Sequence, residues 1–125
     1  TVEDLMLTKD KIPFINENSS MKEALKVITQ KKLGTLIVKN NKGITTGIIT
    51  DGTIRRSNQE NKNLQTLLVK EIMTKNPINV DKEMLAEKAL SIMNYKKITS
   101  LCVNNNKNKT IGILHIHNIL EAKIQ

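Results

Sequence analysis

The sequence predicts an α+β fold made of two copies of one βαββα unit. The first observation is an internal repeat, because moving the first half by 65 residues brings identical residues into register. The second is an alternation of helical apolar stripes with short β-branched runs. The third is a pair of polar corners, each placed between an apolar run and a helical pattern. Units near 60 residues bury little core alone, so we expect the two copies to pack together.

The repeat covers helix, strand and turn positions, which lysine and asparagine bias alone does not explain. Pro13 aligns with Pro77 when the shift is adjusted by one residue, and Met6 aligns with Met73 when it is adjusted by two. We expect copy 1 with its lead-in at 1–60, a connection at 61–70 and copy 2 at 71–125, packed about a pseudo-twofold axis with both corners facing a common cleft. Identical pairs at the 65-residue shift are Ala24-Leu25 with Ala89-Leu90, Val38 with Val103, Asn40-Asn41-Lys42 with Asn105-Asn106-Lys107, Gly47-Ile48 with Gly112-Ile113, and Ile54 with Ile119.

The first copy begins with a short helix predicted over residues 2–8. Pro13 follows and limits the next strand to a short or edge one. Ser20 and Glu23 have the spacing of a capping box, which predicts a helix N-terminus. The helix itself is indicated by an apolar stripe that ends before Gly34, formed by Met21, Ala24, Leu25 and Ile28.

The second half of the copy reads as a hairpin followed by a helix. Residues 35–38 and 46–50 are β-branched runs, and 40–43 carries turn residues between them. The next helix is expected to start with Ile54, with Thr50 or Asp51 as its cap. In copy 2 the equivalent core stripe is Met84, Ala89, Leu90 and Met93.

Composition narrows the class of protein. No apolar run is long enough to span a bilayer, so we expect a soluble, cytoplasmic domain belonging to a longer chain and no membrane partner. Cys102, the single cysteine, lies in an apolar run and is predicted to be a buried thiol. The net charge of +8 raises nucleic acid as a partner. We predict none, because the lysines are scattered among asparagines without interleaved aromatic residues.

The motifs resemble a tandem pair of cystathionine-β-synthase (CBS) domains, known as a Bateman module, over essentially the whole chain. The pattern is most similar to the C-terminal CBS pair of bacterial D-arabinose-5-phosphate isomerases. The residues that carry the resemblance are Asp4-Leu5-Met6, Ile12-Pro13, Gly47-Ile48-Ile49-Thr50-Asp51-Gly52 with Arg55-Arg56, Glu71-Ile72-Met73-Thr74, and Leu114-His115-Ile116-His117 before Asn118.

This resemblance implies a regulatory module rather than an enzyme. CBS pairs of the family bind adenosine nucleotides or similar ligands and regulate an attached protein. The implied parent is an isomerase of ribulose 5-phosphate and arabinose 5-phosphate, in the pathway to keto-deoxyoctulosonate (Kdo) and lipopolysaccharide. Its sugar-isomerase domain would precede Thr1. We therefore expect no catalytic residue and no isomerase activity in this chain, and a homodimeric or homo-oligomeric parent.

The resemblance also places the ligand site at the corners. In the family, a Thr or Ser ends the last strand and an Asp three residues later binds the ribose. Here Thr50 fits the first role, but Thr53 stands at the Asp position, and copy 2 has His115 and Asn118. Neither replacement matches the hydrogen bonds that a carboxylate accepts from ribose hydroxyls. The sequence therefore argues against ordinary AMP or ATP binding.

Several corner residues have two interpretations each. Arg55 and Arg56 either bind a phosphate or carboxylate, with only one pointing into the cleft, or are solvated or paired with Asp51 or Glu60. His115 and His117 are expected to be hydrogen-bonding walls or a pH sensor rather than metal ligands. Asp51 is a cleft residue or only the cap. The helix-to-strand turns Gly34-Thr35 and Thr99-Ser100 either line the cleft, as the resemblance implies, or serve the turn alone.

The leading hypothesis from the sequence is a cleft that binds a regulatory nucleotide or sugar nucleotide. The CMP-activated octulosonate (CMP-Kdo) fits better than AMP, because it adds a carboxylate to its phosphate for a cationic cleft. Two alternatives remain open. One is a structural module that mediates oligomer assembly without a specific ligand, and the other is a CBS pair that senses AMP or ATP for another enzyme.

Overall fold

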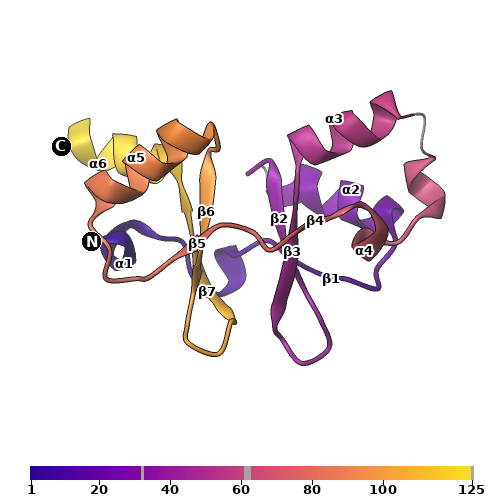
Figure 1. The fold of residues 1–125 in the computed structure, drawn as a ribbon, viewed down its shortest axis with the longest axis horizontal. Coiled ribbons are helices and arrows are strands. Elements are labelled where there is room, and N and C mark those ends of the chain that lie inside the picture. Colours follow the sequence, from indigo (N-terminus) through magenta and orange to yellow (C-terminus); the bar gives the residue numbers. More distant parts are fainter. Residues whose placement is uncertain (32, 61–62, 125) are drawn as a thin grey trace. The chain divides into compact units, whose positions relative to one another are not determined.

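The computed structural model describes residues 1–31, 33–60 and 63–124. The chain divides into two compact units, each with its own sheet (Figure 1). One unit is Pro13–Pro77, and the other combines Thr1–Ile12 with Ile78–Gln125. The predicted α+β class is confirmed, and the pseudo-twofold arrangement stays a prediction. Of the predicted connection 61–70, residues 61 and 62 lie outside the described residues.

The unit Pro13–Pro77 contains the first βαββα sequence. Its four-stranded sheet has the order β1-β2-β3-β4, with β1 parallel to β2 and the other neighbours antiparallel. As the proline predicted, β1 is a short edge strand. The elements are β1 (Phe14–Asn16), α2 (Met21–Lys31), β2 (Thr35–Lys39), β3 (Thr45–Thr50), α3 (Asp51–Gln59), η2 (Leu64–Thr66), α4 (Val69–Ile72) and β4 (Thr74–Lys75).

The other unit repeats the pattern. Its sheet has the order β5-β6-β7, again with a parallel edge pair and an antiparallel hairpin. The elements are α1 (Val2–Leu5), η1 (Lys9–Lys11), β5 (Asn79–Val80), α5 (Ala86–Lys96), β6 (Ser100–Asn104), β7 (Thr110–His115) and α6 (Ile116–Ile124).

Strand register confirms the duplication. Leu36 pairs with Ile49, and Leu101 pairs with Leu114 at positions shifted by 65. Each hairpin also carries an irregularity at the same place, after Val38 in one and after Val103 in the other. Because one register slip would turn every core side chain outward, this agreement means that both copies bury the same face.

The segment that precedes each copy, which we call its lead-in, packs on the other copy. Residues 1–12 belong to the unit of copy 2, and residues 69–75 belong to the unit of copy 1. The Val2 amide donates to the Met84 carbonyl at 2.8 Å, and Leu7 forms an antiparallel bridge with Ile113. In the other unit, β4 pairs with β3, and the Val69 amide donates to the Ser19 carbonyl at 2.8 Å. The limits drawn from the repeat, 1–60 and 71–125, therefore do not coincide with the two compact units.

Each unit has an aliphatic core, as the shortage of aromatic residues requires. Met21, Leu36 and Ile49 are fully buried in one, and Met93 and Leu114 are at most 1% exposed in the other. The predicted stripe residues Met84 and Leu90 are only partly buried at the edge of their cluster. Cys102 is a buried free thiol, as predicted, and burial raises its pKa to about 12. In the described part of the chain, no helix is long and apolar enough to cross a bilayer.

Two helix starts depend on side-chain caps. The Ser20 hydroxyl accepts from the Glu23 amide at 3.1 Å, which supports the predicted cap of α2. The prediction that the next helix starts with Ile54 is wrong, because α3 begins at Asp51. Thr50 is its N-cap, and Asp51 occupies the first helical position, where a carboxylate interacts favourably with the helix dipole.

Candidate functional site

The corner of the first copy joins β3 to α3 through a reciprocal cap. The Thr50 hydroxyl accepts from the Thr53 amide at 3.2 Å, and the Thr50 amide donates to the Thr53 hydroxyl at 3.2 Å. The two hydroxyl oxygens lie 3.1 Å apart, and one hydroxyl donates to the other. Thr53 is only 4% exposed, so its hydroxyl serves the helix cap first. In the part of the chain that the structure describes, the other hydroxyl proton of this pair has no assigned acceptor.

Both arginines of the corner fold back toward the start of α3. A Cβ placed on Gly52 would lie 3.4 Å from Nη1 of Arg56 and 3.9 Å from Nη2 of Arg55. Both guanidinium groups therefore lie near Gly52, and the expectation that only one arginine points into the cleft stays a prediction. Both residues are exposed, and the ion pairs found among the described residues involve other groups. The N-terminus of α3 therefore has two cations beside its backbone donors.

Gly34 lies directly against this corner. Its carbonyl accepts from the Asp51 amide at 3.2 Å, and its φ of +70° belongs to the left-handed region. A Cβ there would lie 2.9 Å from Oδ2 of Asp51, so glycine is required on both counts. The neighbouring Thr35 is 2% exposed, and its hydroxyl donates to the Ile49 carbonyl at 3.3 Å. Thr35 therefore serves the sheet, whereas Gly34 and Asp51 shape the corner surface.

The second copy builds its corner by the same backbone route. The Ile116 amide donates to the Thr99 carbonyl at 2.8 Å, which is the counterpart of the Asp51 to Gly34 bond. The His115 amide donates to Oδ1 of Asn118 at 2.9 Å, as the Thr50 amide does to Thr53. Asn118 therefore takes the capping role at the position where the family resemblance expects a carboxylate.

The two histidines of this corner engage each other. Nδ1 of His115 accepts from the His117 amide at 3.2 Å, and the rings stack with centroids 4.8 Å apart. An accepting Nδ1 places the ring proton on Nε2, so His115 is neutral in this arrangement. Burial and the nearby His117 both lower the pKa of His115. His117 belongs to the first turn of α6, and the described residues contain no group of three His, Cys, Asp or Glu suited to a metal ion.

Ser100 differs from its counterpart in the first copy. Thr35 has a hydrogen-bond acceptor, whereas the buried Oγ of Ser100 has no partner among the described residues. A buried hydroxyl without a partner costs about 1–3 kcal/mol. Ser100 pairs in the sheet with His115, which places this unsatisfied group beside the corner.

The structure therefore gathers the predicted site residues into two sets. Sequence reasoning missed Gly52, although a glycine in the first turn of a helix beside two arginines was visible in the sequence. Whether the two sets face one cleft stays a prediction. The first set, in the unit Pro13–Pro77, is Gly34, Thr35, Thr50, Asp51, Thr53, Arg55 and Arg56, and the second, in the other unit, is Thr99, Ser100, His115, His117 and Asn118.

Comparison with known proteins decides the family. The family model described as CBS domain matches residues 2–60 and 69–125. The chain belongs to the CBS domain family. The two matches coincide with the two copies of the repeat, so this CBS pair is a tandem one.

Curated relatives match nearly the whole chain. Uncharacterized protein RP505 of Rickettsia prowazekii is 36% identical over 98% of this CBS pair. Arabinose 5-phosphate isomerase KdsD is 35% identical in Salmonella typhi and 33% identical in Escherichia coli K12, over the same share. The chain spans only 37% to 38% of the length of these relatives. The similarity to the CBS region of the isomerases is thus confirmed.

Solved structures show the same fold. CBSX2, a CBS-pair protein from Arabidopsis thaliana, was solved in complex with AMP and matches with a TM-score of 0.88 at 26% identity, covering 100% of this chain and 96% of CBSX2. The CBS domain pair of protein MJ0100, solved with 5′-methylthioadenosine and S-adenosyl-L-methionine, matches with a TM-score of 0.86. At 23% identity over 98% of both chains, this second likeness concerns the fold alone.

Proposed function

We propose that this CBS pair is the regulatory, ligand-binding module of an arabinose-5-phosphate isomerase. The similarity to KdsD, at 33% to 35% identity over 98% of the chain, supports this parent. The partner domain is then a sugar isomerase on the N-terminal side, in a cytoplasmic homodimer or homo-oligomer. The chain itself is expected to catalyse no isomerisation, and turnover of ribulose 5-phosphate by the purified chain would contradict this.

The ligand that we propose is a nucleotide or sugar nucleotide that presents at least one anionic group. The observation that carries the proposal is the approach of Arg55 and Arg56 to Gly52 at the start of α3. Two guanidinium groups and the positive end of the helix dipole attract a phosphate or carboxylate, and a glycine leaves room for close approach. The AMP complex of CBSX2 agrees with a ligand of this class.

Within this class, CMP-Kdo suits the corner better than AMP. Thr53 and Asn118 stand where a ribose-binding carboxylate is expected, and both side chains accept a backbone amide in a helix cap. A ribose therefore loses its strongest acceptor. CMP-Kdo brings a phosphate and a carboxylate, so each guanidinium group can bind a separate anion.

Calorimetric titration of the chain with CMP-Kdo and with AMP tests the choice. We expect CMP-Kdo to bind and AMP to bind at least about tenfold more weakly, since losing one charged acceptor costs about 1.5–3 kcal/mol. Arg55→Ala and Arg56→Ala should each weaken CMP-Kdo by about tenfold, whereas Lys42→Ala in the distant hairpin turn should not. Tight AMP binding with no response to CMP-Kdo would assign the module to AMP sensing instead.

The alternative of a structural module without a ligand has one observation in its favour. In the second copy, the cap uses Asn118 and the two histidines engage each other, so the His115 and His117 amides find their partners within the corner. If neither nucleotide binds, and if removing the module from the full-length enzyme changes only its oligomeric state, this alternative replaces the regulatory one.

A further inference from the structure

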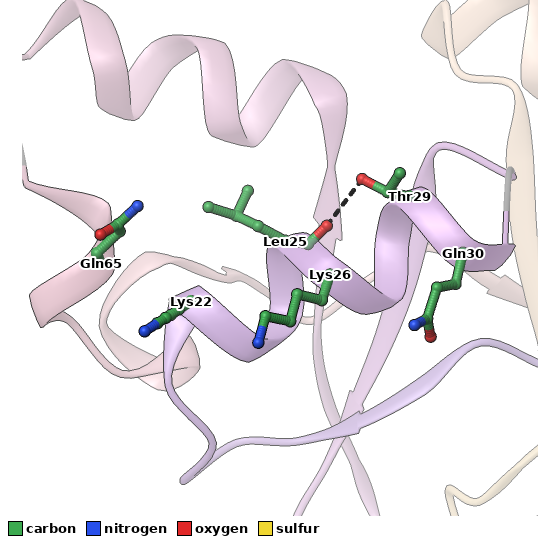
Figure 2. A pocket seen from close by; sticks show the side chains of 6 residues that line it. All are labelled: Lys22, Leu25, Lys26, Thr29, Gln30 and Gln65. Atoms are coloured by element: carbon green, nitrogen blue, oxygen red, sulfur yellow. Dashed lines mark hydrogen bonds between the residues drawn. The ribbon is translucent and has the colours of Figure 1, made fainter.

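Residues 64–67, just before the lead-in of copy 2, pack on α2 in the unit of copy 1. Leu64 is 7% exposed and belongs to the apolar cluster of that unit, against which Leu67 also packs. The short helix η2 contacts α2, and Figure 2 shows Gln65 of η2 facing Leu25. The chain between the two copies therefore adds two apolar side chains to the core beside α2.

An isolated antiparallel bridge fixes this segment at the start of α2. It consists of two backbone hydrogen bonds, both 2.8 Å long. The Met21 amide donates to the Leu67 carbonyl, and the Val69 amide donates to the Ser19 carbonyl. The first amide of a helix has no acceptor within its own helix, so the preceding segment supplies the acceptor that Met21 needs.

The other unit contains one half of the same bridge. Val2 aligns with Val69 in the repeat, and its amide donates to the Met84 carbonyl at 2.8 Å. At the start of α5, Ala86 stands where Met21 stands at the start of α2. The acceptor for its amide would be the carbonyl of the residue directly before the first residue of the chain.

The start of α5 is open where the start of α2 is covered. Among the residues that the structure describes, none accepts a hydrogen bond from the Ala86 amide, and the N-cap Leu85 has no side-chain acceptor to offer. Leu85 is 66% exposed. Charges of both signs surround it, so backbone pairing and apolar contact, rather than net charge, decide what fits here. The open depression has a volume of about 380 Å³ and is lined by Asp81, Glu83, Met84, Leu85 and Lys88.

The nitrogen of Thr1 already lies where a chain amide lies in copy 1. It donates to Oδ2 of Asp4 at 3.0 Å, as the Leu68 amide donates to Oε2 of Glu71 at 2.9 Å. The two pairs align when the 65-residue shift is adjusted by two. A residue joined to this nitrogen therefore enters at the position that Leu67 has in copy 1, beside the start of α5.

We propose that the segment directly before Thr1 in the longer protein docks on the start of α5, as residues 64–67 dock on the start of α2. This rests on the proposed function, which puts an isomerase domain before Thr1, and the chain spans only 37% to 38% of its curated relatives. The residue before Thr1 is apolar like Leu67 and accepts from the Ala86 amide. A second apolar residue lies about one helical turn earlier, as Leu64 does. The connection to the isomerase domain is thereby anchored on the unit that carries the corner with the two histidines.

Hydrogen exchange of the Ala86 amide provides the first test, measured by mass spectrometry on overlapping peptides of the 125-residue chain and of the full-length protein. The amide gains an acceptor in the full-length protein, so it should exchange at least about fivefold more slowly there. The Met21 amide, which has its acceptor in both proteins, should exchange equally. Equal exchange of Ala86 in both would overturn the proposal. Protection that grows with the concentration of the 125-residue chain would also overturn it, because a second copy would then be the occupant.

Turnover of ribulose 5-phosphate by the same full-length preparation keeps this proposal apart from the proposed function. Turnover without protection of the Ala86 amide would leave the isomerase parent in place and overturn the docking. Protection without turnover would support the docking and contradict the isomerase parent.

Ala86→Pro provides the second test, because proline removes the amide that the docked segment needs. Proline is well tolerated at the first helical position, and Leu85 before it has the extended φ of −69° and ψ of 140° that a following proline requires. Urea unfolding compares the 125-residue chain with a chain extended by the docking segment. The substitution should raise the equilibrium constant of unfolding at least about fivefold more in the extended chain. Ala86→Ser keeps the amide and is the matched control, with equal effects expected in both chains. Equal effects of the proline in both chains would overturn the proposal.

Discussion

Met73 packs directly on Gly47, so closely that a Cβ on the glycine would lie 2.5 Å from its sulfur. Met6 packs on Gly112 in the same way in the other unit. Each methionine belongs to the lead-in of the opposite copy, and each glycine lies in the hairpin strand that the lead-in covers. Because these two strand positions have no side chain, each exchanged lead-in can pack directly on its strand.

Gly47→Ala and Gly112→Ala should both destabilise the fold, by about 1–3 kcal/mol each, because an added methyl group meets filled space. The stability lost in Gly112→Ala should be recovered more fully by shortening Met6 than the stability lost in Gly47→Ala is recovered by shortening Met73. A Cβ at Gly112 has the Leu7 carbonyl at 3.2 Å, whereas one at Gly47 also meets the Thr74 carbonyl at 2.9 Å, which shortening Met73 leaves in place.

Urea unfolding of the single and double variants measures this coupling. Gly112→Ala should cost less in a Met6→Ala background than in the wild type, and Gly47→Ala should keep more of its cost in a Met73→Ala background. Equal costs in all backgrounds would mean that the methionines are not what restricts the glycines.

Acidification should destabilise the chain through His115. Burial and His117 lower the pKa of His115 below its ordinary value of about 6.5, so the unfolded chain binds this proton more tightly. The contribution of neutral His115 to the free energy of unfolding is therefore fully present above about pH 6.5. It is lost as the pH falls from there through the lowered pKa of the folded chain. Protonation also removes the Nδ1 acceptor of the His117 amide.

The measurement compares unfolding free energies at about pH 7.5 and about pH 5.5 in the wild type and in His115→Asn. Asparagine keeps a helix-capping acceptor but does not titrate. The variant should lose less stability than the wild type between the two pH values. Equal losses would assign the pH dependence to other groups.

Gly52→Ala should separate ligand binding from stability. A Cβ there would meet Nη1 of Arg56 at 3.4 Å and the Thr50 hydroxyl at 3.5 Å, which is ordinary contact, so the fold should be retained. Alanine also favours the helix over glycine by up to about 1 kcal/mol. The methyl group narrows the approach to the arginines, and we expect the proposed anionic ligand to bind about tenfold more weakly.

Calorimetry and thermal unfolding of the same preparation check both parts of this prediction. Asn58→Ala, on the exposed surface of α3, is the matched control, because it improves helix propensity away from the corner. If Gly52→Ala binds the ligand with unchanged affinity, the ligand does not bind at the start of α3.

The repeat in the sequence was enough to predict the βαββα order and the equivalence of the two corners, because identical residues occupy identical strand registers. The start of α3 was missed because the prediction relied on the first apolar residue, Ile54, whereas the cap between Thr50 and Thr53 starts the helix at Asp51. The exchange of lead-ins was also missed. Met6 and Met73 match each other in the repeat, but pattern alone does not say which copy's glycine each one covers.

The arrangement of the corner side chains was the least predictable part of the site. Helical geometry separates adjacent residues by about 100°, from which we expected only one of Arg55 and Arg56 to point into the cleft. Long side chains with several rotatable bonds overcome this separation, and both guanidinium groups reach Gly52. In the same way, the stacking of His115 on His117 depends on where the strand ends and the helix begins, which a sequence fixes only to within a residue or two.

Thr53→Asp should increase AMP affinity if the missing carboxylate is what disfavours AMP. An aspartate at this position can still accept the Thr50 amide, as Thr53 does at 3.2 Å, and a negative charge in the first turn favours the helix. Its second oxygen is then available to ribose hydroxyls, and we expect AMP to bind about tenfold more tightly than to the wild type. Thr53→Asn has nearly the same shape without the charge and should give a much smaller gain. Calorimetry with AMP decides between them, and a folded Thr53→Asp variant with wild-type affinity would show that the threonine is not what excludes AMP.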